Sequence, residues 1–101
     1  MKIVRVAYTI TPEYVAANQR NIAGIVAELK TLNHPGIKYT AWLLPDGTSF
    51  MHFDQFENEA AHLVLQELAS FKKFASELEA WLITEPKLEL LSLVASTEQY
   101  F

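Results

Sequence analysis

The sequence lacks cysteine altogether and is short of positive charge. Without thiols, it can form no disulfide, thiolate nucleophile or thiolate metal site. Eight Lys and Arg residues stand against twelve Asp and Glu residues, for a net charge of −4. The only basic cluster is Lys72-Lys73. Because nucleic-acid binding requires clustered positive charge to neutralise phosphates, we expect no nucleic-acid partner.

Long hydrophobic runs are absent as well. No apolar stretch approaches the roughly 20 residues that cross a bilayer, so we expect no membrane partner. Residues Met1–Val6 enter a strand pattern at once, without the apolar region and cleavage site of a signal peptide. A cytoplasmic location is expected, and the absence of cysteine fits it.

What the chain does contain is enough apolar material for one core. Half of its 101 residues are hydrophobic and a fifth are charged. This composition is typical of a globular domain, and the length allows one domain, residues 1–101.

The first half of the chain predicts a strand followed by a helix. Residues 2–10 alternate with period two, with Val4, Val6, Tyr8 and Ile10 on the more apolar face. Thr11, Pro12 and Glu13 then suit the cap and first turn of a helix. An apolar stripe with helical spacing follows: Val15, Ile22, Ile25, Val26, Leu29 and Leu32. The sequence Asn33–Gly36 is expected to end this helix.

A hairpin is predicted next, from strands at 37–44 and 48–56. Pro45 and Gly47 suggest a three-residue connection with a type I turn and a bulge, which places Leu44 opposite Thr48. The resulting register pairs Trp42 with Phe50, Thr40 with His52 and Lys38 with Asp54 on one face. Tyr39–Phe53 and Ala41–Met51 pair on the other face. We expect the second set to lie under the helices and the first to face away from them.

The second half predicts a helix and a final strand. Asn58 is expected to cap the helix, Ser70 to restart it after a kink, and Thr84–Pro86 to end it. The leucine-rich segment Leu88–Thr97 is predicted to be a well-buried strand, after which the C-terminal tail is free to cross to a partner. The whole order is β-α-β-β-α-β, an α+β ferredoxin-like fold with a four-stranded antiparallel sheet and two helices on one face. The uncovered face is partly apolar, so it is expected to need a partner.

Two short segments, Phe56–His62 and Ser70–Phe74, carry a family resemblance. With the order of elements, they resemble the dimeric α/β barrel superfamily, of the antibiotic-biosynthesis monooxygenase-like and stress-responsive barrel types. The resemblance implies a homodimer in which two open sheet faces pack together, with a small-molecule cavity in each protomer. Members that oxidise aromatic polyketides or degrade haem commonly use Asn, Trp and His. The first strand offers no Asn on the expected pocket face. Trp42 is on a different strand from the Trp of the haem-degrading members. We therefore expect no cofactor.

The expected site follows from the predicted hairpin register. The proposed ligand-binding residues on the open face are Arg5, Lys38, Thr40, Trp42, Phe50 and Asp54. His52 and His62 are the proton acceptors of an enzymatic alternative, since imidazole titrates near neutrality. The three histidines lack recognised metal-ligand spacing, so no metal site is expected.

The sequence is compatible with three functions. The first is binding or sensing a small aromatic or anionic molecule. The second is a cofactor-independent monooxygenase-like enzyme that uses His52 or His62. The third is an assembly module without a ligand, because aromatic residues and Arg are enriched at interfaces in any case. The sequence therefore does not decide whether the protein is an enzyme.

Overall fold

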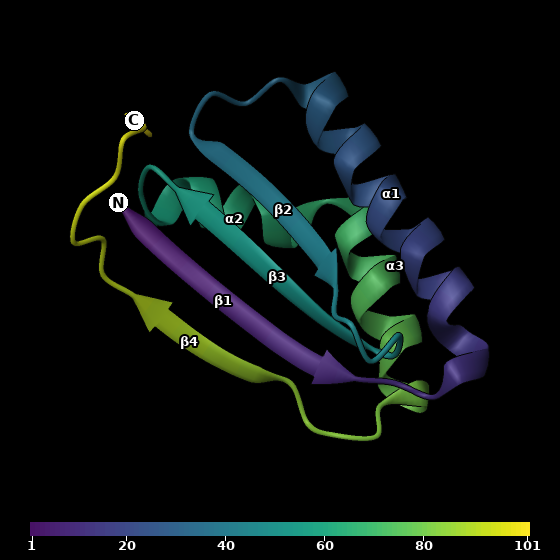
Figure 1. Cartoon of the computed structure of the whole chain (residues 1–101). Helices are drawn as coiled ribbons and strands as arrows, with labels where there is room; N and C mark the ends of the chain where they lie inside the picture. The colour runs from purple at the N-terminus through teal and green to yellow at the C-terminus, as the bar shows by residue number, and fades with distance from the viewer.

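A computed structural model describes all 101 residues and shows a four-stranded antiparallel sheet with its helices on one side (Figure 1). The strand order is β2-β3-β1-β4, which confirms the ferredoxin-like α+β fold. None of the helices combines the length and hydrophobicity needed to cross a membrane. In chain order the elements are β1 (Lys2–Thr9), η1 (Pro12–Tyr14), α1 (Val15–Leu32), β2 (Ile37–Leu43), β3 (Ser49–Phe56), α2 (Glu59–Glu67), α3 (Ala69–Leu78), η2 (Glu79–Trp81) and β4 (Lys87–Leu91).

The ends of α1 follow the local signals in the sequence. Pro12 opens a single 3-10 turn, which continues directly into α1 at Val15. At the other end, Asn33 adopts a left-handed conformation with φ 52°, and its N–H donates to the carbonyl oxygen of Leu29 at 2.9 Å. Asn tolerates this conformation better than most residues, so the predicted stop is confirmed.

The second helix is broken, as predicted, but Ser70 does not cap the break. Asn58 begins α2 by accepting a hydrogen bond from the N–H of Ala61 at 3.0 Å. Leu68 then adopts an extended conformation that separates α2 from α3. The backbone N–H and hydroxyl of Ser70 both donate to the Glu28 carboxylate, at 3.0 and 2.5 Å. Ser70 therefore ties α3 to α1, which lies beside it (Figure 1).

The predicted register of the β2–β3 hairpin is wrong by one residue. Trp42 lies opposite Met51, and Tyr39 lies opposite Asp54. The cause is the connection, where the N–H of Leu44 donates to the carbonyl oxygen of Ser49 at 2.8 Å. Thr48 is thereby left in a four-residue loop.

The side chain of Asp46 holds that longer loop. Its carboxylate accepts from the backbone N–H groups of Thr48 and Ser49, at 3.0 and 2.8 Å. Gly47 has a φ of 79°, which a residue without a β-carbon adopts at little cost. The turn residues were identified correctly, whereas the loop length depended on this side-chain contact.

A shift of one residue moves every side chain of a strand to the other face. Phe50, His52 and Asp54 therefore face the helices, together with Tyr39. Arg5 lies with Phe53 on the open face of the sheet. Lys38, Thr40 and Trp42 are on that open face too. The expectation that all of these residues share one face is wrong.

The hydrophobic core lies between the sheet and the helices. Its most deeply buried hydrophobic side chains come from every layer: Ile10, Ile25, Phe50, Phe56 and Leu65. Burial of such side chains contributes roughly 1.5–3 kcal/mol each relative to leaving them exposed. Packing of this core between the sheet and the helices holds β1 and β3 in place, and these two strands carry most of the site described below.

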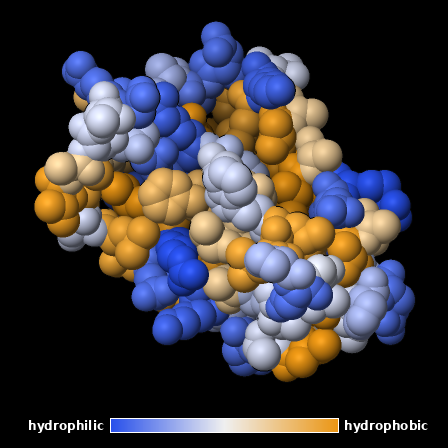
Figure 2. Space-filling model, in the orientation of Figure 1, coloured by the Kyte–Doolittle hydropathy of each residue, from blue (hydrophilic) through white to orange (hydrophobic).

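β4 is shorter and far more exposed than predicted. It ends at Leu91, and the chain continues to Phe101 without further regular structure. Leu88 and Leu90 point to the helix side but are 60% and 68% exposed, because β4 is the edge strand farthest from α1 (Figure 1). On the open face of the sheet, Figure 2 shows hydrophobic surface toward the end of β4 and in the segment after it.

Candidate functional site

A cavity of about 430 Å³ lies between the helix-facing side of the sheet and the α2–α3 segment. Eleven of its 18 lining residues are hydrophobic. Val4 and Val6 line it from β1, and Phe71, Phe74 and Leu78 line it from α3. A volume of this size suits a small organic molecule, and the hydrophobic walls favour one with an apolar ring.

A chain of buried hydrogen bonds centres on His52. The Tyr8 hydroxyl lies 2.7 Å from His52 Nε2, and the Tyr39 hydroxyl lies 2.7 Å from His52 Nδ1. Asn18 extends the chain from α1, because its Nδ2 donates to the Tyr8 hydroxyl at 2.9 Å. His52 is only 4% exposed and Asn18 is fully buried. We call Asn18, Tyr8, His52 and Tyr39 the relay.

Burial fixes the protonation states along the relay. It lowers the pKa of His52 to about 4, so the imidazole is neutral near pH 7 and has a single N–H. Burial also raises the pKa of Tyr8 and the pKa of Tyr39, so both phenols keep their protons.

These states limit the directions of the hydrogen bonds. The two contacts of the neutral His52 ring allow either tautomer. We assign Tyr8 as the donor to His52 Nε2, because its oxygen already accepts from Asn18 and its buried hydrogen then has a partner. His52 then carries its proton on Nδ1 and donates it to the Tyr39 oxygen. The hydroxyl hydrogen of Tyr39 is left free for a group in the cavity. The relay thus presents one fixed hydrogen-bond donor to a ligand.

Asp54 is the least satisfied polar group of the cavity. It lies opposite Tyr39 across the β2–β3 pair and is 7% exposed. Its Oδ1 has no hydrogen-bond partner. Burial raises the pKa of Asp54 to about 7, because desolvation disfavours the charged carboxylate. Near neutral pH this group can both accept and return a proton.

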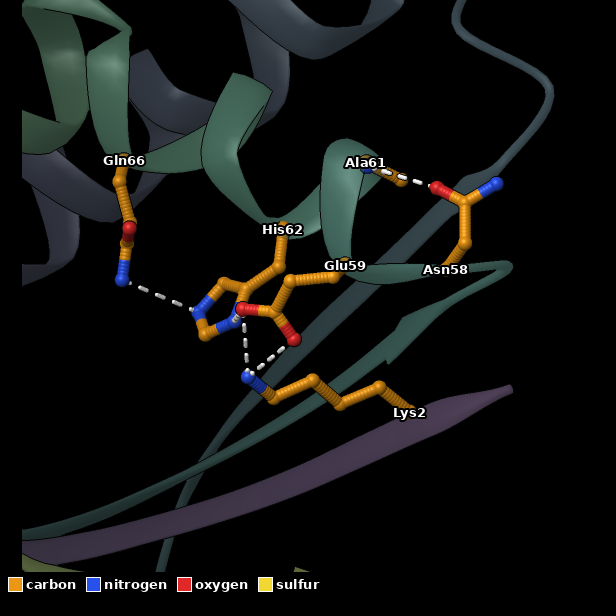
Figure 3. Close-up of polar contacts among 6 residues, drawn as sticks. All are labelled: Lys2, Asn58, Glu59, Ala61, His62 and Gln66. Carbon is orange, nitrogen blue, oxygen red and sulfur yellow. Dashed lines mark hydrogen bonds and ion pairs between the residues drawn. The ribbon is translucent and has the colours of Figure 1, made fainter.

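His62 projects from α2 near Glu59 and Gln66 (Figure 3). It also lines the cavity. Its ring stacks on Phe56 with the centroids 4.4 Å apart, and its Nε2 lies 3.3 Å from the Gln66 amide. The Nδ1 atom is buried and 3.9 Å from Glu59, which is too long for a hydrogen bond. Burial, and secondly the charge of Lys2, lower the pKa of His62.

The structure brings only part of the predicted site to the cavity. Of the predicted residues, His52, Asp54 and His62 line it. Phe50 packs in the core, stacked on Tyr8 with ring centroids 5.8 Å apart.

The remaining four predicted residues lie on the other side of the sheet. Arg5 pairs with Glu89 at 2.7 Å, and the Lys38 ammonium lies 5.5 Å from the centroid of the Phe101 ring. Thr40 and Trp42 are exposed on the same face. Because neither Arg nor Lys lines the cavity, the expected cationic anchor for an anionic ligand is absent from it.

Three relay residues were missed from sequence: Asn18, Tyr8 and Tyr39. Asn18 had a readable signal, since it interrupts the apolar stripe of α1 three residues after Val15 and four before Ile22. A polar residue at such a position must find a buried partner. The sequence pattern places Tyr8 and Tyr39 among the core aromatic residues. Nothing in their spacing indicates that both hydroxyls contact one histidine.

No protein-family model matches the sequence, and no curated protein matches it either. Solved structures do match it in fold. An antibiotic biosynthesis monooxygenase superposes with a TM-score of 0.79 at 18% identity, over 94% of this chain and 100% of that one. The protein Rv0793 from Mycobacterium tuberculosis gives 0.80 at 11% identity, over 96% and 98%. The protein PA3566 from Pseudomonas aeruginosa gives 0.75 at 24% identity, over 93% and 95%. The chain therefore has the ferredoxin-like fold of the antibiotic biosynthesis monooxygenase-like proteins.

Proposed function

We propose that this protein is a homodimer in which each protomer binds a small, largely hydrophobic and uncharged molecule in the cavity between sheet and helices. A phenol or an aromatic ketone has the required chemistry. One observation carries the proposal: the relay holds the Tyr39 hydroxyl in place at a hydrophobic cavity. Apolar walls with a few placed polar groups are the usual form of a small-molecule site.

The charges around the cavity argue for a neutral ligand. Asp54, Glu79 and Glu85 line it, and no Lys or Arg does. A carboxylate ligand would meet repulsion from these groups without a compensating ion pair. A hydroxyl or carbonyl oxygen can instead take the hydrogen bond that Tyr39 has free.

The open sheet face supports the homodimer. Trp42 is 54% exposed there, and Leu91 is exposed on the same face. The Arg5–Glu89 ion pair lies on this face as well. Exposed aromatic and leucine side chains around a paired charge form a surface that a second copy would cover.

The proposal is tested by closing the cavity. Ala75 lies on α3, is exposed and lines the cavity, so Ala75→Trp is expected to fill its opening. Binding of 2-naphthol, followed by calorimetry, is expected to fall at least tenfold. Ala23→Trp on the exposed surface of α1 is the matched control and is expected to bind like the wild type.

Native mass spectrometry of the untagged protein reports the oligomeric state in the same preparation. A dimer that retains a small organic molecule supports the proposal fully. A dimer that neither carries nor binds an aromatic molecule favours the assembly module instead. A monomer contradicts the homodimer and leaves the cavity to be judged by the calorimetry alone.

A second candidate, a cofactor-independent monooxygenase-like activity, is favoured by the fold of the neighbour described as an antibiotic biosynthesis monooxygenase. In this alternative His52 or His62 would accept the proton that a substrate must lose before it reacts with oxygen. Oxygen uptake with an electron-rich phenol tests it. If His52→Ala and His62→Ala both leave the uptake unchanged, neither histidine serves as the base.

A further inference from the structure

A second chemical role emerges from Asp54 and Tyr39, which are cross-strand neighbours on the helix-facing side of the sheet. Asp54 is a buried carboxyl that lines the cavity and has one unpartnered oxygen, and Tyr39 lies opposite it across the β2–β3 pair. The assigned direction of the His52–Tyr39 hydrogen bond leaves the hydroxyl hydrogen of Tyr39 without a partner. Directly opposed residues of an antiparallel pair have β-carbons about 5 Å apart. A bound molecule can therefore contact a proton acceptor and a hydrogen-bond donor at once.

We propose that the cavity catalyses a proton shift in enolisable ketones, with Asp54 as the base and Tyr39 as the donor to the carbonyl oxygen. The proposal rests on the function proposed above, since the ketone must first bind in the cavity. This second proposal adds an activity and a catalytic residue, because the sequence predicted only a ligand-binding role for Asp54. His52 acts as a positioning residue that holds Tyr39.

The step balances without any further reagent. A C–H bond next to the carbonyl breaks, and its proton passes to an Asp54 carboxylate oxygen. The bonding pair forms the C=C bond of an enolate, while the carbonyl π pair moves onto the oxygen that Tyr39 holds. Asp54 then returns the proton, either to the same carbon or to the far end of a conjugated double bond. The net reaction is an isomerisation, with neither oxidation nor reduction.

Two features of the site suit this chemistry. Asp54 lines the cavity, and no group of the protein forms a hydrogen bond with its Oδ1 that a proton transfer would have to break. Tyr39 already accepts from His52 Nδ1, and accepting a hydrogen bond strengthens the same hydroxyl as a donor. A positioned donor at the developing oxyanion is commonly the largest catalytic contribution.

The experiment uses 2-tetralone, a neutral aromatic ketone with acidic hydrogens beside its carbonyl. Exchange of these hydrogens in D₂O is followed by proton NMR, above the rate in buffer alone. The wild type is expected to accelerate exchange with saturation. Asp54→Asn is expected to lower the rate constant about 100-fold, within the usual range for loss of a general base, while the tetralone affinity stays within threefold. Tyr39→Phe is expected to lower it at least about 100-fold, the usual range for loss of one oxyanion donor.

Controls separate this role from a structural one. Glu67→Gln removes an exposed carboxylate of α2 outside the cavity and is expected to exchange like the wild type. The wild-type rate is expected to rise with pH through about 7, and Asp54→Asn is expected to lose this rise. The other titratable groups lining the cavity remain in that variant: Tyr8, Tyr39, His52, His62, Glu79 and Glu85. Thermal melting confirms that each variant is folded.

The outcomes distinguish the two proposals. Tetralone that binds but exchanges equally fast with wild type and Asp54→Asn overturns the proton-shift proposal and leaves the binding proposal standing. Failure of both tetralone and 2-naphthol to bind overturns the two together. If Asp54→Asn proves unfolded, Asp54→Glu keeps the carboxyl and moves it, and an unchanged rate there also overturns the proposed geometry.

Discussion

The two faces of this one sheet use polar residues in opposite ways. On the helix-facing side, His52 is buried and bonded on both ring nitrogens. On the open side, charged groups pair at the surface, and Trp42 is exposed on the same face. Both sides belong to the same alternating strands, so the difference comes from what covers each face. A buried polar group needs a hydrogen-bond partner within the chain. An exposed cluster of apolar side chains is instead typical of a surface that binds another molecule.

The largest effect is expected from removing a covered aromatic ring. Phe50→Ala on the helix-facing side should lower the free energy of unfolding by about 3–5 kcal/mol, because the ring is 2% exposed in the core. Urea unfolding should show this loss at every protein concentration. Phe53→Ala on the open face is the control, and its loss should depend on concentration if that face is a dimer interface. Equal, concentration-independent losses would contradict the distinction between the faces.

Next in size is a pH effect of Asp54. Its pKa is about 7 in the folded chain against an ordinary 3.8, so the folded state binds the proton more tightly between these values. The free energy of unfolding therefore falls as the pH rises from about 4 to about 7. Asp54→Asn should remove this loss and be more stable than the wild type by up to about 4 kcal/mol at pH 8.

His52 acts in the opposite direction over much of the same range. Its pKa is about 4 in the folded chain against 6.5, so its contribution to the free energy of unfolding rises between these values. The two slopes oppose each other in the wild type. Urea unfolding from pH 4 to 8 should therefore show a steeper rise for Asp54→Asn than for the wild type. Parallel curves would mean that Asp54 does not carry a raised pKa.

The open face should respond in assembly rather than in folding. Trp42→Ala is expected to weaken the dimer at least 30-fold, because truncating a Trp that is an interface hot spot typically costs about 2 kcal/mol or more. Analytical ultracentrifugation measures the dissociation constant, and calorimetry with 2-naphthol should show unchanged binding. If 2-naphthol binding is lost while the dimer stays intact, Trp42 belongs to the ligand site, as the sequence predicted.

The smallest effect concerns the rim of the open face. Lys38→Gln removes the ammonium that lies over the Phe101 ring, an exposed contact worth about 0.5 kcal/mol. A double-mutant cycle with Phe101→Ala should return a coupling energy of this size in urea unfolding. A coupling of zero would mean that the C-terminal tail does not rest on this face in solution.

The sequence was informative wherever structure depends on neighbours along the chain. Alternation in β1, the end of α1 at Asn33 and the Asn58 cap were all readable, because they depend on periodicity and on contacts within a few residues. The order of these elements was sufficient to predict the ferredoxin-like fold. The exposure of β4 was not readable, since leucine content reports hydrophobicity and not whether a helix lies above the strand.

The candidate site depended on one contact that the pattern could not supply. The Asp46 carboxylate lengthens the hairpin loop by one residue and so turns His52 and Asp54 toward the helices. Local sequence determined the fold and its turns, because propensity, capping and periodicity act over short distances. Only the tertiary structure decided the relay and the unpaired Asp54 oxygen, because these depend on which distant groups meet when β1, β2, β3 and α1 pack together.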